Sequence, residues 1–213
     1  MMLTLNANLV LGYTAFVIGV ASPGPSVLAV MGTAMAQGRT RALALAAGIV
    51  SGSLCWGLSA AFGLGALMQR WSAALMIVKA IGGLYLLWMA WQAARKAVRG
   101  ITLDKTLQAG ADEAYARTYA RGAALHLTNP KAIVVWLSVV SLALPQGSGQ
   151  ADALAFVTSC AGLSATIFCC YALAFSTGAA RRGYRAAERW VNALLAGVFA
   201  YAGVRMLLSS QAR

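Results

Sequence analysis

Long apolar segments alternate with short polar stretches along this chain. Six apolar segments, each of about 20 residues or more, are long enough to cross a hydrocarbon core of about 30 Å as helices. They lie near residues 9–36, 42–68, 72–94, 119–145, 153–178 and 187–208. The longest polar stretch, about 96–118, divides the chain in half. This pattern predicts an all-α integral membrane protein with six transmembrane helices, three in each half.

Proline motifs interrupt the first and the fourth apolar segments. The first contains Ser22-Pro23-Gly24-Pro25-Ser26, and the fourth contains His126-Leu127-Thr128-Asn129-Pro130-Lys131. Proline lacks a backbone donor and disfavours helical geometry in the residue before it. In hydrocarbon, a broken helix is tolerated only where protein or a watery cavity satisfies the freed groups. A simple proline kink is the alternative, but the motifs favour two helices that are broken near the middle of the membrane.

The two breaks occupy corresponding positions in the two halves. Pro130 follows Pro23 by about half the length of the chain, and three spans per half make the halves run in opposite directions. Paired interruptions of this kind are typical of inverted-repeat secondary transporters. We therefore expect a single membrane domain over residues 1–213. Repeat one would cover about 1–95, a cytoplasmic loop about 96–118, and repeat two about 119–213.

The distribution of charge predicts the orientation in the membrane. Only 10% of the 213 residues are charged, while 60% are hydrophobic, which excludes an ordinary soluble domain. Twelve of the 17 Lys and Arg residues lie in the first, third and fifth polar loops: Arg39, Arg41, Arg95, Lys96, Arg99, Lys105, Arg117, Arg121, Arg181, Arg182, Arg185 and Arg189. The other side has Arg70, Arg205 and Arg213. Because cytoplasmic loops hold the excess of Lys and Arg, both termini are expected to be periplasmic.

The order of residues at each break predicts which helix end faces the gap. Asn129 and Pro130 are suited to the cap and the first position of a helix, and Gly24 and Pro25 can do the same. Two helix N-termini that meet near the midplane would attract an anion. The carbonyl groups at residues 20–22 and 125–128 would then hold a cation. Together these groups describe a site for a zwitterionic amino acid, and the lack of Asp or Glu inside the spans argues against a second positive charge.

Three further side chains within the spans are candidates. Lys131 either binds or gates a carboxylate, or pairs with carbonyls that the break frees. Lys79 either binds or extends outward toward the membrane surface. His126, the one histidine, lies three residues before Asn129 and would share its helix face; it either carries a coupling proton or is structural. The candidate substrate-binding residues are therefore Ser22, Pro23, Gly24, Pro25, Ser26, Lys79, His126, Thr128, Asn129, Pro130 and Lys131.

Small residues recur along the second apolar segment. Ala44, Gly48 and Gly52 are four residues apart and so lie on one face of a helix. Such a face allows close approach of a neighbouring helix, either within the monomer or in another protomer. Packing within the monomer is the interpretation we favour, while a homo-oligomer stays open.

These motifs resemble those of the lysine exporter (LysE/RhtB) superfamily of bacterial amino-acid efflux proteins. The matching features are Ser22–Pro25, Gly38 with Arg39, Ala47, Gly48 and Gly52, Lys79 through Gly82, Leu84 through Leu86, Trp88, and Leu127–Lys131. The resemblance covers nearly the whole chain. It implies a multi-pass exporter in the bacterial inner membrane, energised by the proton gradient, for amino acids or small derivatives of the homoserine or homoserine lactone type. Some members have an acid in the fifth span, where this chain has Ser164 and Thr166, so the proton carrier stays open.

The function we expect is efflux of a neutral amino acid by alternating access about the two breaks. A passive channel, or an exporter of a basic amino acid or another small solute, is the alternative. A membrane enzyme would need clustered acids, a metal site or an activated nucleophile, and the chain has one histidine and no carboxylate inside the spans. We therefore expect no catalytic residues, metal or cofactor. The expected partners are the substrate, the bilayer and protons, but not nucleic acid. The pattern also leaves open whether one segment is re-entrant and the spans number five.

Overall fold

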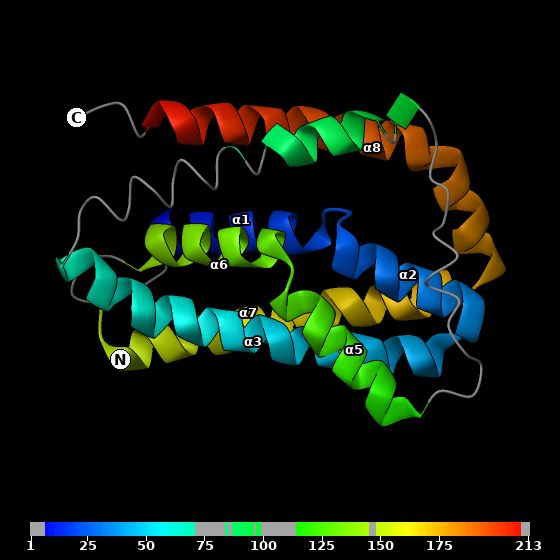
Figure 1. Cartoon of the computed structure of the whole chain (residues 1–213), viewed down its shortest axis with the longest axis horizontal. Coiled ribbons are helices and arrows are strands. Elements are labelled where there is room, and N and C mark those ends of the chain that lie inside the picture. The colour runs from blue at the N-terminus through cyan, green and yellow to red at the C-terminus, as the bar shows by residue number, and fades with distance from the viewer. Residues whose placement is uncertain are drawn as a thin grey trace. The chain divides into compact units, whose positions relative to one another are not determined.

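The computed structural model describes residues 7–70, 84, 87–95, 97, 98, 114–144 and 148–209, and every secondary-structure element in these ranges is an α-helix (Figure 1). The helices are α1 (Ala7–Ala21), α2 (Pro25–Gln37), α3 (Arg39–Arg70), α5 (Tyr115–Leu127), α6 (Pro130–Ala143), α7 (Gln150–Phe175) and α8 (Gly178–Ser209). Residues 87–95 are also helical. Lys79 and most of the predicted loop 96–118 lie outside the described residues.

Two helices are interrupted at the proline motifs. α1 ends just before the first motif and α2 begins within it, and α5 ends within the second motif, where α6 begins. The axis bends by 48° between α1 and α2 and by 62° between α5 and α6. Pro25 and Pro130 stand in the first turn of α2 and α6, with Gly24 and Asn129 as the cap residues. The Asn129 side chain accepts a hydrogen bond from the backbone N–H of Lys131, as expected for an N-cap. Local chemistry therefore sets where both second half-helices begin.

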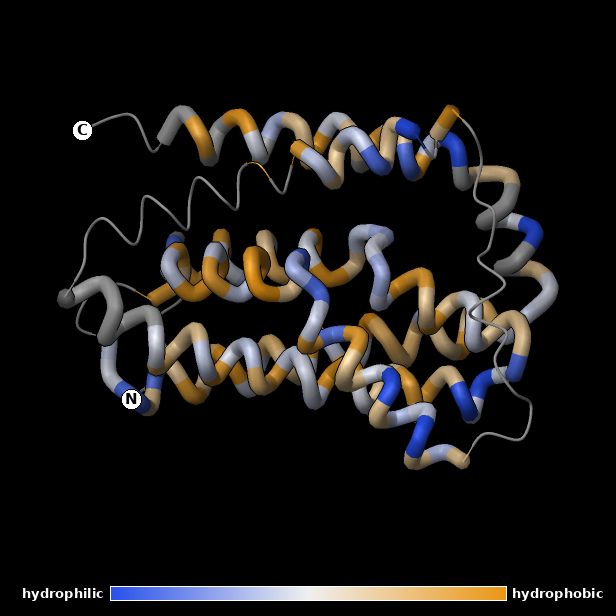
Figure 2. Tube along the Cα trace, in the orientation of Figure 1, coloured by the Kyte–Doolittle hydropathy of each residue, from blue (hydrophilic) through white to orange (hydrophobic). Residues whose placement is uncertain are grey.

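Several helices have the length and composition of membrane spans. Among the described residues, α7 and the stretch Arg39–Gly63 of α3 each meet this test alone, and each bent pair meets it as a unit, which gives up to four spans. Figure 2 shows hydrophobic residues along α1, α6 and α7, and strongly hydrophilic ones around the α2–α3 turn and the start of α5. The described part is thus an all-helical membrane protein, while the total of six spans stays a prediction.

The structure corrects two predicted loops. The arginine-rich stretch 181–185 is not a loop, because α8 begins at Gly178 and continues through it. Ala and Arg both favour helices, so a cluster of positive charge does not interrupt one. The predicted first loop, around Arg39 and Arg41, shrinks to Gly38, whose φ of 85° suits glycine.

The chain divides into two compact units. Unit 1 contains Met1–Ala66 and Asp104–Thr177, and unit 2 contains Leu67–Leu103 and Gly178–Arg213. In unit 2, Met89, Ala90 and Ala93 form a small core with Phe199 of α8. Each unit draws on both halves of the sequence. The prediction of one domain with repeats at 1–95 and 119–213 is not tested by this division.

Unit 1 surrounds the two breaks with closely packed helices. The first half-helix α1 packs along α6 and α7, and α2 packs along α7 and α5. The centre is filled by Phe16, Trp136, Phe156 and Phe168, all of them fully buried. The two breaks therefore lie inside the unit.

The small-residue face of α3 packs within the monomer, as predicted. A side chain at Gly48 would overlap the carbonyl oxygen of Tyr119 in α5, and a Cβ at Gly52 would lie 3.1 Å from Cβ of His126. On the facing helix α5, a side chain at Gly122 would overlap the carbonyl oxygen of Leu45 in α3. Backbone contact between α3 and α5 thus fixes the position of His126.

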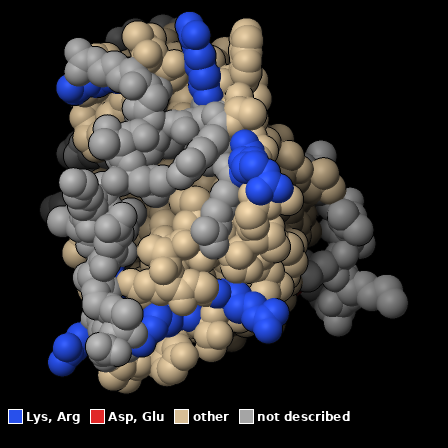
Figure 3. Space-filling model, turned by 90° about the vertical axis from the view of Figure 1, so that its right-hand side faces the viewer, with Lys and Arg blue, Asp and Glu red and all other residues tan. Residues whose placement is uncertain are grey.

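Basic side chains gather at one end of unit 1. This end holds the α2–α3 turn and the start of α5, and Figure 3 views it with Lys and Arg in blue. Arg39 and Arg117 are exposed there. The guanidinium of Arg41 lies over the ring of Tyr115, 5.4 Å from its centroid. Two loops that the sequence assigned to the same side of the membrane therefore lie at the same end.

Candidate functional site

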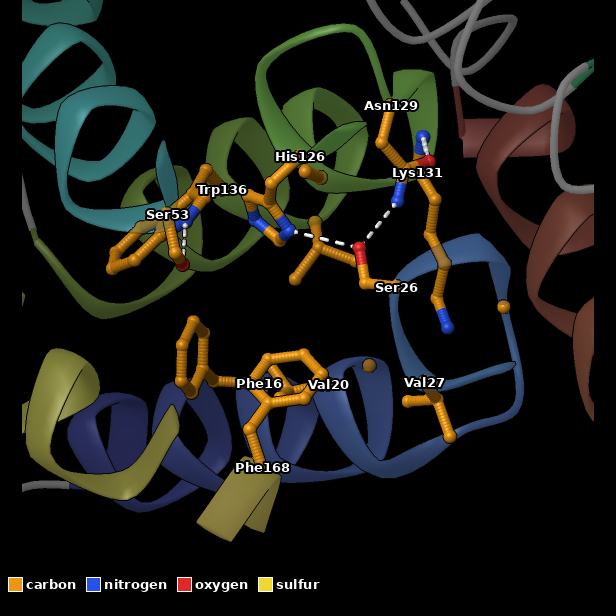
Figure 4. Close-up of a pocket in the computed structure, with 14 residues that line it drawn as sticks. Phe16, Val20, Ser26, Val27, Ser53, His126, Asn129, Lys131, Trp136 and Phe168 are labelled. Carbon is orange, nitrogen blue, oxygen red and sulfur yellow. Dashed lines mark hydrogen bonds between the residues drawn. The ribbon is translucent and has the colours of Figure 1, made fainter. Parts of the chain in front are cut away.

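The two helix breaks line a single pocket inside unit 1. Its empty space, open mouth included, is about 360 Å³. One side, here called the polar wall, is formed by Gly24, Ser26, His126, Asn129 and Lys131. The apolar lining residues, here called the apolar wall, are Phe16, Val20, Val27, Val135, Trp136 and Phe168. In Figure 4, Phe16, Val20 and Phe168 lie opposite Ser26, while Trp136 lies beside His126. Both halves of the chain contribute to each wall.

Hydrogen bonds join the starts of α2 and α6 across the polar wall. The Oδ1 atom of Asn129 accepts from the backbone N–H of Lys131 at 3.1 Å, so its Nδ2 group is the donor. This Nδ2 donates to Ser26 Oγ at 3.3 Å. Ser26 Oγ in turn lies 3.0 Å from Nδ1 of His126. The start of α2 is thereby connected at the pocket to α5 and to the start of α6, which lie 100 and 103 residues further along the chain.

This network is compatible with one tautomer of neutral His126 in particular. Ser26 Oγ accepts from Asn129 and can donate its own hydrogen to Nδ1 of His126, and in that arrangement the ring hydrogen is on Nε2. Nε2 is buried and has no hydrogen-bond partner among the described residues. A buried donor without a partner costs about 1–3 kcal/mol. His126 Nε2 is therefore a candidate contact for a bound solute.

The ammonium group of Lys131 reaches across to the other break. Its Nζ donates to the backbone oxygen of Ser22 at 2.6 Å and to Ser22 Oγ at 2.7 Å. Ser22 follows the last residue of α1, where the helix dipole is negative. The sequence left two roles open for Lys131, binding or gating a carboxylate and pairing with a freed carbonyl. In this conformation Lys131 pairs with the freed carbonyl of Ser22. A Cβ at Gly24 would lie 3.1 Å from the same Nζ, so a side chain there would displace the end of Lys131 by a few tenths of an ångström.

The carbonyls that were expected to hold a substrate cation already accept hydrogen bonds from the protein. Tyr171 of α7 donates to the Ala21 oxygen at 2.7 Å, and Trp56 of α3 donates to the Leu127 oxygen at 3.2 Å. Unpaired carbonyls at a helix end need donors, and side chains of neighbouring helices supply them. Lys131 does the same for Ser22. That these carbonyls hold a substrate cation stays a prediction, and in this conformation three of them accept hydrogen bonds from side chains.

The structure brings most of the predicted site residues together, but not all of them. Gly24, Ser26, His126, Asn129 and Lys131 line the pocket, and Ser22 holds the Lys131 ammonium. The three prolines do not line it; Pro25 and Pro130 begin helices, and Pro23 lies between α1 and α2. Lys79 lies outside the described residues.

Two predictions about the fourth-segment break need correction. Thr128 is exposed, and its hydroxyl donates to the Ala124 oxygen at 2.8 Å at the end of α5 instead of facing the pocket. His126 and Asn129 do not share a helix face, because α5 ends at Leu127 and Asn129 caps α6. They meet through Ser26 instead.

Sequence reasoning missed the apolar wall. Phe16 and Val20 precede the first break by less than two turns, and Val135 and Trp136 follow the second by a similar distance. Proximity to a break was therefore a usable signal for these four. Phe168 comes from the unbroken helix α7, where an apolar residue in an apolar segment gives no signal of a pocket.

Comparison with known proteins assigns the family. The family model described as "LysE type translocator" matches residues 17–210, which include both breaks and the whole pocket except Phe16. The chain belongs to the LysE type translocator family. The resemblance inferred from the proline motifs is confirmed.

Individual relatives of this translocator are named for different amino acids. It is 28% identical to the threonine efflux protein of Salmonella typhi over 199 residues, which cover 91% of this chain and 94% of the relative. It is 32% identical to the leucine efflux protein of Enterobacter sp. (strain 638) over 134 residues, which cover 61% of this chain and 62% of the relative. An uncharacterized membrane protein of Escherichia coli (strain K12), YahN, is 30% identical over 87% of this chain and 83% of its own length. No solved structure matches the chain.

Proposed function

We propose that this translocator is a secondary exporter of a neutral amino acid or a small derivative, such as homoserine or its lactone, across the bacterial inner membrane. It would work by alternating access about the two helix breaks, with protons as the coupling ion. The family match and the efflux proteins among the relatives support amino-acid export. Their names differ in the amino acid, one with a polar side chain and one with an apolar side chain, and so leave the side chain open.

The observation that carries the proposal is the hydrogen bond between Asn129 and Ser26. It holds the N-termini of α2 and α6 together at one wall of a buried pocket, with the Lys131 ammonium beside them. Each N-terminus is equivalent to about half a positive charge. Such a place suits a carboxylate, which would accept hydrogen bonds from backbone N–H groups and from Lys131.

The contacts of Lys131 suggest how the substrate amino group is bound. A carboxylate in the pocket would attract the Lys131 ammonium away from Ser22, because it carries a full negative charge whereas the Ser22 oxygens are neutral. The Ser22 oxygens, which now accept from Lys131 at 2.6 and 2.7 Å, would then be open to the substrate ammonium. Both charges of a zwitterion would be paired by one shift of a side chain. Binding would also release one of the links between the two breaks, that from Lys131 to Ser22.

Matched contacts between the halves support an inverted repeat. Exchanging the halves pairs α1 with α5, α2 with α6 and α3 with α7. Under this exchange the α1–α6 contact corresponds to α5–α2. The hydrogen bond from Tyr171 of α7 to the last carbonyl of α1 likewise corresponds to that from Trp56 of α3 to the last carbonyl of α5. Such symmetry suits a protein that rocks about a central site.

The remaining parts of the proposal are the coupling and the topology. His126 is the proposed proton carrier, because it is the one histidine and lines the pocket beside both helix N-termini. Placing the basic end of unit 1 in the cytoplasm puts the N-terminus, at the other end of α1, in the periplasm. The C-terminus would be periplasmic from the distribution of Lys and Arg in the sequence.

Counterflow in proteoliposomes tests the proposed function. Vesicles loaded with an unlabelled neutral amino acid should take up the labelled one above equilibrium, and a pH gradient alone should drive its net accumulation. Gly24→Leu, which disturbs the contact with Lys131, should show neither effect. A channel would equilibrate the label without counterflow. Counterflow that a pH gradient does not affect would remove proton coupling but keep the exporter.

A further inference from the structure

Two packing contacts lead from the pocket toward opposite ends of unit 1. The contact of α1 with α6 is here called the outer seam, and the contact of α2 with α5 the inner seam. Each becomes the other when the two halves of the chain are exchanged. The inner seam runs toward the basic end with the α2–α3 turn, and the outer seam runs away from it (Figure 1).

The outer seam is closed by tight apolar packing. A Cβ at Gly12 of α1 would lie 2.5 Å from the Cβ of Ala143 in α6. Nearer the pocket, the rings of Phe16 and Trp136 pack with centroids 4.9 Å apart. Surfaces packed in this way leave no room for a solute, and parting them would expose apolar groups to water.

The inner seam differs, because its helices carry two buried hydroxyls without partners. Thr33 of α2 and Thr118 of α5 are 1% and 2% exposed. Neither Oγ1 has a hydrogen-bond partner among the described residues. Buried polar groups in folded proteins are nearly always hydrogen-bonded, and water is the partner where protein is not. These two hydroxyls are therefore less stable in the closed protein than they would be in a hydrated seam.

Both hydroxyls lie at the same depth between the pocket and the basic end. Ser26 and His126 mark the pocket end of the inner seam, where Ser26 Oγ lies 3.0 Å from Nδ1 of the histidine (Figure 4). Thr33 follows Ser26 by seven residues, two turns along the same face of α2, and Thr118 precedes His126 by eight. At 1.5 Å per residue these intervals are about 10 and 12 Å. Tyr115, three residues further out in α5, is exposed.

We propose that the inner seam is the cytoplasmic gate of this translocator, and that Thr33 and Thr118 line the route by which substrate and water reach the pocket. α2 and α5 part there while the outer seam stays closed, so this structure is the state closed to the periplasm. Water in the open inner seam gives both hydroxyls a partner, whereas opening the outer seam gains no such contact. The inference rests on the proposed function, since it assigns an entry route to the same pocket.

Opening this gate also changes the surroundings of His126. Parting α2 from α5 breaks the contact of Ser26 Oγ with Nδ1 of His126, whereas the hydrogen bond from Asn129 to Ser26 joins α6 to α2 and can persist. His126 stays with α5, which the glycine contacts hold against α3. The imidazole is then open to water that enters through the seam. One movement thus connects the proposed proton carrier with the cytoplasm.

Cysteine labelling in oriented vesicles tests the gate. Thr33→Cys and Thr118→Cys are made in a variant that lacks the four native cysteines and keeps counterflow. A membrane-impermeant maleimide should modify both in inside-out vesicles and neither in right-side-out vesicles. The control is Val139→Cys, which is buried in α6 between Trp136 and Ala143 and should stay unmodified from the cytoplasmic side.

The outcomes of labelling separate the gate from the exporter. If counterflow persists but neither threonine position reacts from the cytoplasmic side, the gate is overturned and the exporter stands. Reaction from the periplasmic side alone, or equal reaction of Val139→Cys, would overturn the assignment of the two seams. Absence of counterflow with every amino acid in the unmodified protein would overturn the proposed function, and the gate with it.

Removing the hydroxyls without changing the shape of the side chains tests their role directly. Thr33→Val and Thr118→Val, made with the native cysteines in place, remove an unpaired group from the closed state. The melting temperature should therefore rise, while the initial rate of efflux of the amino acid that shows counterflow should fall roughly tenfold. Thr158→Val in α7 is the matched control, because that hydroxyl already donates to the Leu154 oxygen at 2.8 Å, and it should not slow efflux. A lower melting temperature with unchanged efflux in the first two variants would contradict the gate.

Discussion

Lys131 is one of the residues that connect the two broken helices. The backbone N–H of Lys131 is capped by Asn129 at the start of α6, while its Nζ reaches the Ser22 oxygens beyond the end of α1. Both Ser22 contacts are with neutral oxygen atoms, so neither cancels its charge. A buried charge is expensive inside a membrane and marks a functional site by default. At this scale Lys131 is both a link between the breaks and the proposed partner of the substrate carboxylate.

Replacing Lys131 by Met should keep the protein folded and inserted but lower transport roughly tenfold to a hundredfold, the equivalent of one hydrogen bond to a charged group. Lys131→Arg should recover little, because the guanidinium is planar and larger than the ammonium. Initial rates of efflux from loaded proteoliposomes measure this effect, with Ser22→Ala as the variant that removes only one neutral partner. Unchanged efflux in Lys131→Met, together with a lower melting temperature, would assign the lysine a structural role alone.

At the scale of helices, the glycine face of α3 sets the position of α5. Gly48 and Gly122 bring the backbones of these two helices into direct contact, and Gly52 lies against His126. Close backbone approach needs residues without side chains. The polar wall of the pocket therefore depends on glycines of α3 and α5 that do not themselves line the pocket.

Gly48→Leu should displace α5 and, with it, His126. The added side chain would overlap the Tyr119 carbonyl, and overpacking of this kind costs about 1–3 kcal/mol. The melting temperature of the purified protein and its substrate affinity should both fall. Gly63→Leu is the control on the same helix, because a side chain there meets nothing within 4 Å among the described atoms. Equal melting temperatures for the two variants would show that the α3–α5 contact is not tight.

How much the sequence reveals depends on whether a feature is local. Pro25, Pro130 and Asn129 act within one helical turn, and both helix starts could be predicted from them. Arg181 and Arg182 mark a side of the membrane but do not end a helix, so the loop predicted there was wrong. Phe168 faces the pocket only because α7 packs on the broken helices, and no local pattern encodes that.

Residues from both halves of the sequence contribute to each compact unit and to the pocket. Unit 1 holds both broken helices, and unit 2 holds later segments of both halves. The α2–α3 turn and the start of α5 lie at one end of unit 1, where their arginines are found. The excess of Lys and Arg on cytoplasmic loops is the basis for the proposal that this end faces the cytoplasm. The proposed inverted repeat with a central site would account for these features together.

Reporter fusions test the proposed topology. With both termini periplasmic, alkaline phosphatase fused after Arg213 should be active, and a green fluorescent protein at the same place should stay dark. A fusion at Gln37 in the α2–α3 turn should behave in the opposite way. Fluorescence from the C-terminal fusion, with an inactive phosphatase there, would reverse the orientation or make the number of spans odd.

The central claim is that the two breaks form one substrate site, and a double-mutant cycle on substrate affinity tests it most directly. Gly24→Leu blocks the approach to backbone at the first break, and Asn129→Leu removes the cap and the hydrogen bond to Ser26 at the second. The Kd of the amino acid for wild type, both single variants and the double variant would be measured by calorimetry on folded, purified protein. If both residues serve one bound state, the losses are expected to be non-additive by about 0.5–3 kcal/mol. Losses that simply add would show two independent kinks and place the substrate elsewhere.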